Sequence, residues 1–196
     1  MKRVVILASG SGTLAQAIID AHLEIDIVAV ISDKQNAPVL ERAQKAGIET
    51  FTIPMLPDRT EWDRELETLL AALKPDLVVS AGFMRILSEK IVARFKIINS
   101  HPALLPLFPG AHAIRDALAA GATETGTTIH WVDAGVDTGE VIAQERVEIL
   151  PGDTEESLHE RIKIVERGLI VATIASLITT IEKMNGEKTN GEKMNG

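Results

Sequence analysis

The sequence contains no cysteine and no tyrosine, and it has few aromatic side chains of any kind. Without cysteine, the chain can have no disulfide, no thiol nucleophile and no cysteine ligand for zinc or an iron–sulfur cluster. Four phenylalanines and two tryptophans are too few for a surface on which nucleobases stack. The chemistry must therefore come from histidine, amide, carboxylate, hydroxyl and cationic side chains, and from the backbone.

Basic residues are also in the minority, since 20 lysines and arginines face 28 acidic residues, giving a formal net charge of −8. A nucleic-acid partner is not expected, because binding it requires a basic face that neutralises phosphates. The apolar stretch 168–181 is too short to span a membrane. The apolar run 4–8 is too short for a signal peptide. We expect a cytoplasmic protein that acts on small molecules, as a monomer or homodimer.

The 196 residues, 45% of them hydrophobic, predict one domain around one core. We expect this single domain to cover residues 1–183. The remaining segment, 184–196, repeats the letters NGEK and is polar and rich in glycine. Such a composition predicts a low-complexity, disordered tail without chemistry.

Short apolar runs alternate with helical patterns, which is typical of βα units. The predicted strands cover residues 3–8, 25–32, 48–53, 77–81 and 97–99. The predicted helices cover residues 13–21, 38–46, 62–73 and 111–120. The capping-box pair Asp153 and Glu156 predicts that one more, long helix begins there, with Leu158, Ile162, Val165 and Leu169 on one face. From Thr125 the apolar period changes to two, and residues 141–149 alternate in the same way. The expected fold class is therefore α/β: a Rossmann-like, mostly parallel twisted sheet with helices on both faces and a late antiparallel pair.

The turn Ser9-Gly10-Ser11-Gly12-Thr13 joins the first predicted strand to the first predicted helix. Its small residues allow an anion to approach the backbone, and the helix N-terminus offers free N–H groups. The turn matches neither a dinucleotide fingerprint nor a P-loop. It is either a phosphate site or a tight connection, and its place at the carboxyl end of a parallel strand favours phosphate.

Asn99 and His101 follow at the end of the fifth predicted strand. In an extended segment their spacing points both side chains to the same side, where both can donate to one developing oxyanion. Alternatively, the asparagine caps a turn and the histidine is solvated. Asp137 lies in a glycine-rich loop and is either a turn former or, beside a histidine, a proton relay. His130 alternates within a strand and is predicted to serve packing.

Three segments together resemble the folate-dependent formyltransferase family: Asn99–Pro106 (NSHPALLP), Ala81–Ser88 (AGFMRILS) and Asp137–Gly139 (DTG). The resemblance runs from residue 3 to about residue 180. It implies the formyltransferase fold and transfer of the formyl group of 10-formyltetrahydrofolate, a cosubstrate, to an amine. Together with the length and the N-terminal turn, the resemblance implies that the acceptor is the amine of 5-phosphoribosylglycinamide, in purine (IMP) biosynthesis, and that the amine attacks through a tetrahedral intermediate. No metal is expected, since no histidines show ligand spacing.

The resemblance also implies which residues act. Asn99 and protonated His101 would stabilise the oxyanion, and Asp137 would hold His101 charged and move protons. The residues implied to bind the ribonucleotide are Gly12, Thr13, Leu14 and Glu166. The residues implied to bind folate are Arg59, Met84, Arg85, Ile86, Leu87, Asp133 and Val136. Leu14 departs from the asparagine of many relatives, so phosphate binding would rest on backbone N–H groups and Thr13.

Three related activities are disfavoured by features of the sequence. A methionyl-tRNA formyltransferase would need an additional C-terminal nucleic-acid-binding domain, and a formyltetrahydrofolate hydrolase an extra N-terminal regulatory domain. An ATP-dependent formate ligase is disfavoured by the missing P-loop. A non-catalytic nucleotide-binding module is the alternative from another class, and it does not require Asn99, His101 and Asp137 to meet in space.

Overall fold

The computed structural model places seven strands in one sheet, in the order β3-β2-β1-β4-β5-β6-β7. It describes the backbone of residues 1–193 and the side chains of residues 1–180. The strands are β1 (Lys2–Leu7), β2 (Ile25–Ser32), β3 (Thr50–Thr52), β4 (Leu77–Ser80), β5 (Ile97–His101), β6 (Glu124–Trp131) and β7 (Val141–Glu148). The strands from β3 to β5 pair in parallel, whereas the β5–β6 and β6–β7 pairs are antiparallel. The predicted fold class is confirmed.

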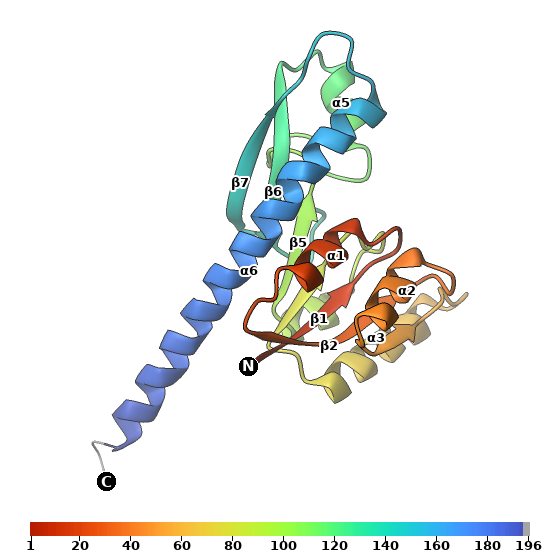
Figure 1. Cartoon of the computed structure of the whole chain (residues 1–196). Coiled ribbons are helices and arrows are strands. Elements are labelled where there is room, and N and C mark those ends of the chain that lie inside the picture. The colour runs from red at the N-terminus through yellow and green to blue at the C-terminus, as the bar shows by residue number, and fades with distance from the viewer. Residues whose placement is uncertain (194–196) are drawn as a thin grey trace.

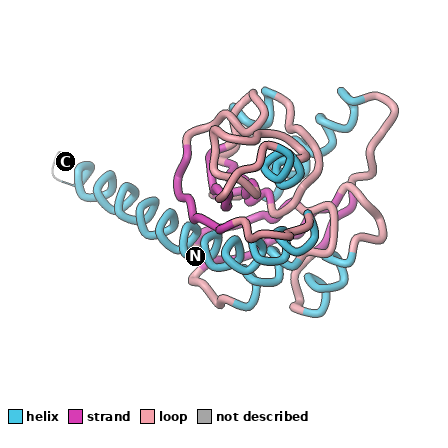
Figure 2. Tube along the Cα trace, turned by 90° about the horizontal axis from the view of Figure 1, so that it is seen from above, coloured by secondary structure: helices cyan, strands magenta, loops and turns pink. Residues whose placement is uncertain are grey.

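Helices cover both faces of the sheet (Figures 1 and 2). They are α1 (Thr13–Asp20), α2 (Pro38–Lys45), α3 (Arg59–Leu73), α4 (Glu89–Arg94), α5 (Ala113–Ala119) and α6 (Glu155–Lys193). One apolar cluster joins one face of the sheet to α1, α2 and α6. A second cluster joins the other face to α3 and α4. Because β1 lies between the two clusters, Val4 to Leu7 are all buried, as their continuous apolar run predicts.

The C-terminal helix α6 extends into the segment that is predicted to be a disordered tail. Its apolar side chains as far as Ile178 contribute to the core, and its later turns project away from the body (Figures 1 and 2). Residues 184–193, most of the predicted tail, continue this helix, because helical hydrogen bonds are satisfied within the segment and need no apolar partner. Residues 194–196 lie outside the described residues. The division of the chain at residue 183 stays a prediction.

Helix α3 illustrates how a sequence pattern becomes core. Trp62, Leu66 and Leu70 repeat at helical spacing and are fully buried against the sheet. The Trp62 ring stacks on Phe83 with a centroid distance of 6.2 Å, and its indole N–H donates to the carbonyl of Ile53 at 3.0 Å. The helix therefore anchors the loop that follows β4, where Phe83 lies.

Truncating this core should have a large effect on stability. We expect Leu66→Ala to lower the free energy of unfolding by about 2–5 kcal/mol, because it leaves a cavity in a fully buried cluster. Leu69→Ala, on the half-buried side of the same helix, should cost clearly less. Urea denaturation followed by circular dichroism measures both values. Equal losses for the two variants would contradict the burial pattern.

Candidate active site

Strand β5 presents the first two site residues at the carboxyl edge of the sheet. Side chains alternate along a strand, so Asn99 and His101 point to the face covered by α3 and α4, while Ser100 points to the other face. His101 is buried and Asn99 is partly exposed. The two potential donors therefore lie side by side at the end of a parallel strand, where open α/β sheets bind ligands.

Asp137 reaches this edge from the loop between β6 and β7. Its Oδ2 atom lies 3.3 Å from Nδ1 of His101. The aspartate has φ of +54°, in the left-handed region that aspartate tolerates better than most side chains. The structure thus brings His101 and Asp137 together, although they are 36 positions apart in the chain. No strand pairing links them, because Asp137 lies in a loop.

The loop after β5 closes against both of these residues. Nε2 of His101 lies 2.8 Å from the carbonyl oxygen of Phe108, and the N–H of Gly110 donates to Oδ2 of Asp137 at 2.8 Å. A carbonyl oxygen only accepts hydrogen bonds, so Nε2 must carry a proton. Nδ1 faces a carboxylate, which also accepts. Both ring nitrogens of His101 therefore face oxygen atoms that accept hydrogen bonds.

His130 is the site residue that sequence reasoning missed. Its Nε2 atom lies 3.4 Å from Oδ1 of Asp137 and 3.3 Å from Nδ2 of Asn99, so it links the two. His130 is buried, as the expectation that it serves packing requires, and the antiparallel register also places it directly opposite Asn99 on the same face, where it contacts two polar residues of the site. The alternation of β6 contained this signal, but using it requires the β5–β6 pairing.

These contacts set the charge state of Asp137. Partial burial raises the pKa of this carboxyl group, but the hydrogen bonds from His130 and from the N–H of Gly110, together with the charge of His101, outweigh burial. The pKa of Asp137 therefore lies below its ordinary value. The group is a carboxylate at neutral pH, flanked by two imidazole rings.

The turn between β1 and α1 has the features of an anion site. Among the described residues, none accepts a hydrogen bond from the six consecutive backbone N–H groups of residues 10–15. Gly12 has φ of +73°, and a Cβ there would lie 2.4 Å from the Val39 side chain, so only glycine fits. The Leu14 side chain is buried in the core, which leaves its backbone N–H as the only group it can offer an anion.

Glu166 approaches β5 from α6, on the face opposite to Asn99 and His101. The Ser100 hydroxyl donates to Oε1 of Glu166 at 2.5 Å. Burial raises the pKa of Glu166 above its ordinary value, although the hydrogen bond from Ser100 and the charge of Lys163 act in the opposite direction. The structure therefore separates Glu166 from the other carboxylate, Asp137, by the thickness of the sheet.

The segment after β4 forms an apolar border of the site. Met84 and Ile86 are exposed, as is Val136 of the loop between β6 and β7. Leu87 differs from them, because it is buried in the cluster with Phe83 and so attaches the segment to the core. Val132 packs against the same cluster, so the 84–87 segment and the loop after β6 share one support.

The polar residues implied to bind folate already have partners. Nε of Arg85 lies 2.7 Å from Oδ2 of Asp33, whose side chain is fully buried. Arg59 pairs with Asp63 at 2.9 Å and also donates to the carbonyl of Ile86, which ties α3 to the exposed apolar segment. Asp133 is exposed, and its Oδ1 accepts hydrogen bonds from the N–H of Gly135 and the hydroxyl of Thr138 within its own loop. These side chains support the shape of the site.

A family model described as formyl transferase matches residues 2–174, and the chain belongs to this family. A phosphoribosylglycinamide formyltransferase of Mycobacterium tuberculosis (strain CDC 1551 / Oshkosh) is 48% identical over 184 residues, which cover 90% of this chain and 85% of that protein. The enzyme of the same name from Escherichia coli (strain K12) is 41% identical over 180 residues, covering 88% of this chain and 85% of that protein.

A solved structure shows the same fold. Glycinamide ribonucleotide transformylase 1 from Symbiobacterium toebii superposes with a TM-score of 0.86 at 41% identity, covering 89% of this chain and 86% of that one. Within the part of the chain that the structure describes, no three histidine or acidic side chains gather as a metal site. No helix among the described residues is long and apolar enough to cross a membrane.

The hydrogen bond between Ser100 and Glu166 can be tested directly. A hydroxyl that donates to a carboxylate favours the charged form, so Ser100→Ala should raise the pKa of Glu166 further above its ordinary value. Carbon-13 NMR titration of the Glu166 carboxyl group measures the change. Ser176→Ala, on an exposed position of the same helix, should leave this pKa where it is. A pKa unaffected by loss of the Ser100 hydroxyl would contradict the contact.

Proposed function

We propose that this chain transfers the formyl group of 10-formyltetrahydrofolate to the amine of 5-phosphoribosylglycinamide, a step of purine (IMP) biosynthesis. The observation that carries the proposal is the contact between His101 and Asp137 at the end of β5, beside Asn99, in a member of the formyl transferase family. A non-catalytic nucleotide-binding module would not require these three side chains to meet.

The two faces of the sheet suggest where each substrate lies. The residues implied to bind the ribonucleotide belong to α1, its preceding turn and α6, which cover one face. The residues implied to bind folate belong to the N-terminus of α3, the loop after β4 and the loop after β6, which share the cluster on the other face. Under the proposal, the amine and the formyl group meet at the edge between them, at Asn99 and His101.

The chemistry follows from the donors at this edge. The substrate amine attacks the formyl carbon, a carbon–nitrogen bond forms, and the formyl oxygen becomes an oxyanion. Asn99 and the Nε2–H of His101 donate to this oxyanion, and such donors are most effective where charge develops. In the structure the Phe108 carbonyl accepts the Nε2–H, so the formyl oxygen takes the place of this carbonyl when substrate binds.

Collapse of the tetrahedral intermediate breaks the bond between the formyl carbon and the folate nitrogen. The attacking amine must lose a proton, and the departing folate nitrogen must gain one. Asp137, as a carboxylate with a lowered pKa, keeps His101 protonated and relays this proton, through water where needed. No step needs a covalent bond to the enzyme, which suits a chain without cysteine.

The proposal includes three broader statements. Residues 1–183 form a single formyltransferase domain, which the match of the family model to residues 2–174 supports. The enzyme is cytoplasmic and acts as a monomer or homodimer. Its partners are the two small-molecule substrates, and the net charge of −8 supports the exclusion of nucleic acid.

Substitution of the charged pair should abolish most of the activity. We expect His101→Ala and Asp137→Asn each to lower kcat by roughly two to four orders of magnitude, because each removes an oxyanion donor or a proton-transfer group. His112→Ala is the matched control: it removes an exposed histidine from the loop after β5 and should leave kcat within about twofold. Near-normal turnover of either site variant would remove that residue from the mechanism.

The same assay separates this function from its rivals. Release of the formyl group is followed with and without 5-phosphoribosylglycinamide, using 10-formyltetrahydrofolate as donor. We expect turnover only when the acceptor amine is present. Equal turnover without the acceptor would identify a hydrolase, and no turnover in either case would contradict the proposed function.

A further inference from the structure

The turn between β1 and α1 is held in place by α2. The N–H of Val39 donates to the carbonyl of Gly10 at 3.3 Å, and the Val39 side chain fills the space that a Cβ on Gly12 would need. Between these two positions, Nε of Arg42 donates to the carbonyl of Ser11 at 2.8 Å. Helix α2 therefore touches three consecutive residues of the turn, and Arg42 supplies the only side-chain hydrogen bond among these contacts in the described residues.

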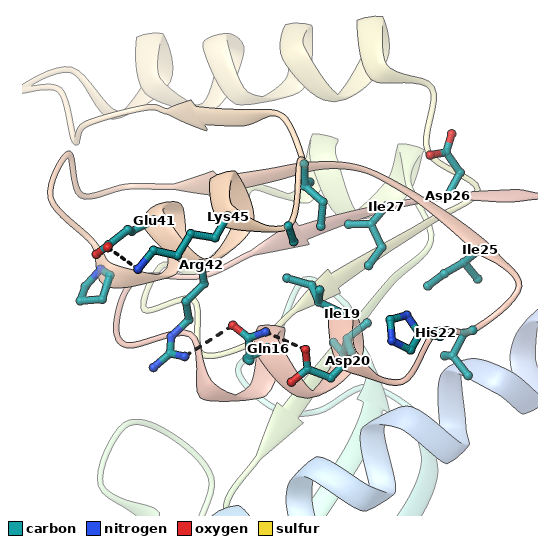
Figure 3. Close-up of a pocket in the computed structure, with 15 residues that line it drawn as sticks. Gln16, Ile19, Asp20, His22, Ile25, Asp26, Ile27, Glu41, Arg42 and Lys45 are labelled. Atoms are coloured by element: carbon teal, nitrogen blue, oxygen red, sulfur yellow. Dashed lines mark hydrogen bonds and ion pairs between the residues drawn. The ribbon is translucent and has the colours of Figure 1, made fainter.

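A second contact orients the arginine. Gln16 of α1 donates to Asp20 at 2.8 Å, and its side-chain oxygen lies 3.5 Å from Nη1 of Arg42 (Figure 3). These residues line one part of a cavity of about 810 Å³ between α1, α2 and β2. The guanidinium is thus directed at the turn while it stays within reach of solvent.

Arg42 also differs from Lys45 on the same helix, and from Arg59 and Arg85 elsewhere in the chain, because those three cations form ion pairs. Lys45, one turn further along α2, pairs with Glu41 at 2.6 Å, Arg59 pairs with Asp63, and Arg85 pairs with Asp33. Among the ion pairs of the described residues, none includes Arg42. Its positive charge acts on the adjacent Glu41 without an ion-pair contact, and it lies against the turn whose N–H groups have no acceptor among the described residues.

We propose that Arg42 is a positioning residue for the phosphate of the ribonucleotide substrate. It fixes the carbonyl of Ser11, and so orients the N–H groups of residues 10–15 toward the anion, while its charge adds to the positive potential of the α1 N-terminus. In a chain of net charge −8, such a local positive group offsets the repulsion of an anionic substrate. The proposal rests on the proposed function, since it concerns the phosphate of that acceptor.

Steady-state kinetics of the full chain test the assignment. We expect Arg42→Ala to raise KM for 5-phosphoribosylglycinamide about tenfold or more, the effect typical of losing a charged hydrogen-bond donor. The kcat value and KM for 10-formyltetrahydrofolate should stay within about twofold. The inhibition constant of inorganic phosphate, competing with the ribonucleotide, should rise in parallel. Arg42→Lys, which keeps the charge and one donor, should restore part of the affinity.

Lys45→Ala is the matched control, because it removes the same charge from the same helix without touching the turn. A KM for the ribonucleotide that is unchanged in Arg42→Ala, or raised equally in Lys45→Ala, would overturn the assignment. So would a fall in kcat at unchanged KM. If Arg42→Ala does not fold, a KM of Arg42→Lys equal to that of the wild type overturns it.

Failure of this assignment and failure of the proposed function give different results. A wild-type enzyme without acceptor-dependent turnover contradicts the function. Normal wild-type turnover with no change in Arg42→Ala contradicts only the role of the arginine. Were the function to fail, binding of inorganic phosphate, measured by calorimetry on the wild type and both alanine variants, still tests Arg42: weaker binding in Arg42→Ala alone supports the role, and equal binding overturns it.

Discussion

The site depends on the two-sided pairing of β5, which is parallel to β4 and antiparallel to β6. The parallel pair brings the end of β5 to the edge where the other βα turns meet. The antiparallel pair places His130 opposite Asn99, and its following loop delivers Asp137. Because side chains alternate, the same strand sends Asn99 and His101 to one face and Ser100, with Glu166, to the other. A shift of one residue in this register would exchange the two faces.

Electrostatics in this protein act over short distances. Both proposed substrates are anionic, while the chain carries a net charge of −8, so the net charge of the protein does not steer the substrates toward the site. Arg59 and Arg85 are paired with carboxylates and fix the segment after β4, on the side proposed for folate. The groups proposed for the phosphate are the backbone N–H groups at the start of α1 and the guanidinium of Arg42, which forms no ion pair among the described residues. At the reaction edge, two imidazoles keep the Asp137 carboxylate ionised despite partial burial.

Much of the fold and part of the site could be predicted from local pattern. The strand at 25–32 has the predicted bounds, and the apolar face of α3 is buried as its spacing requires. The sequence shows that Leu14 departs from the asparagine of many relatives. Its burial in the core could not be predicted, because the sequence does not show which elements pack against α1. His130 was assigned to packing and Arg42 was overlooked, since each acquires its neighbours only from a different element of the chain.

The sequence alone determined the class of fold and excluded the chemistry that needs cysteine. It also placed a glycine-rich turn after β1 and an asparagine and a histidine at the end of β5. These properties depend on composition and on periods of two and 3.6 residues, which are local. Tertiary structure decided which histidines meet Asp137, which arginine donates to the turn before α1, and which face of the sheet each side chain occupies. Those properties depend on register and on contacts between elements that lie far apart in the chain, which a local pattern does not encode.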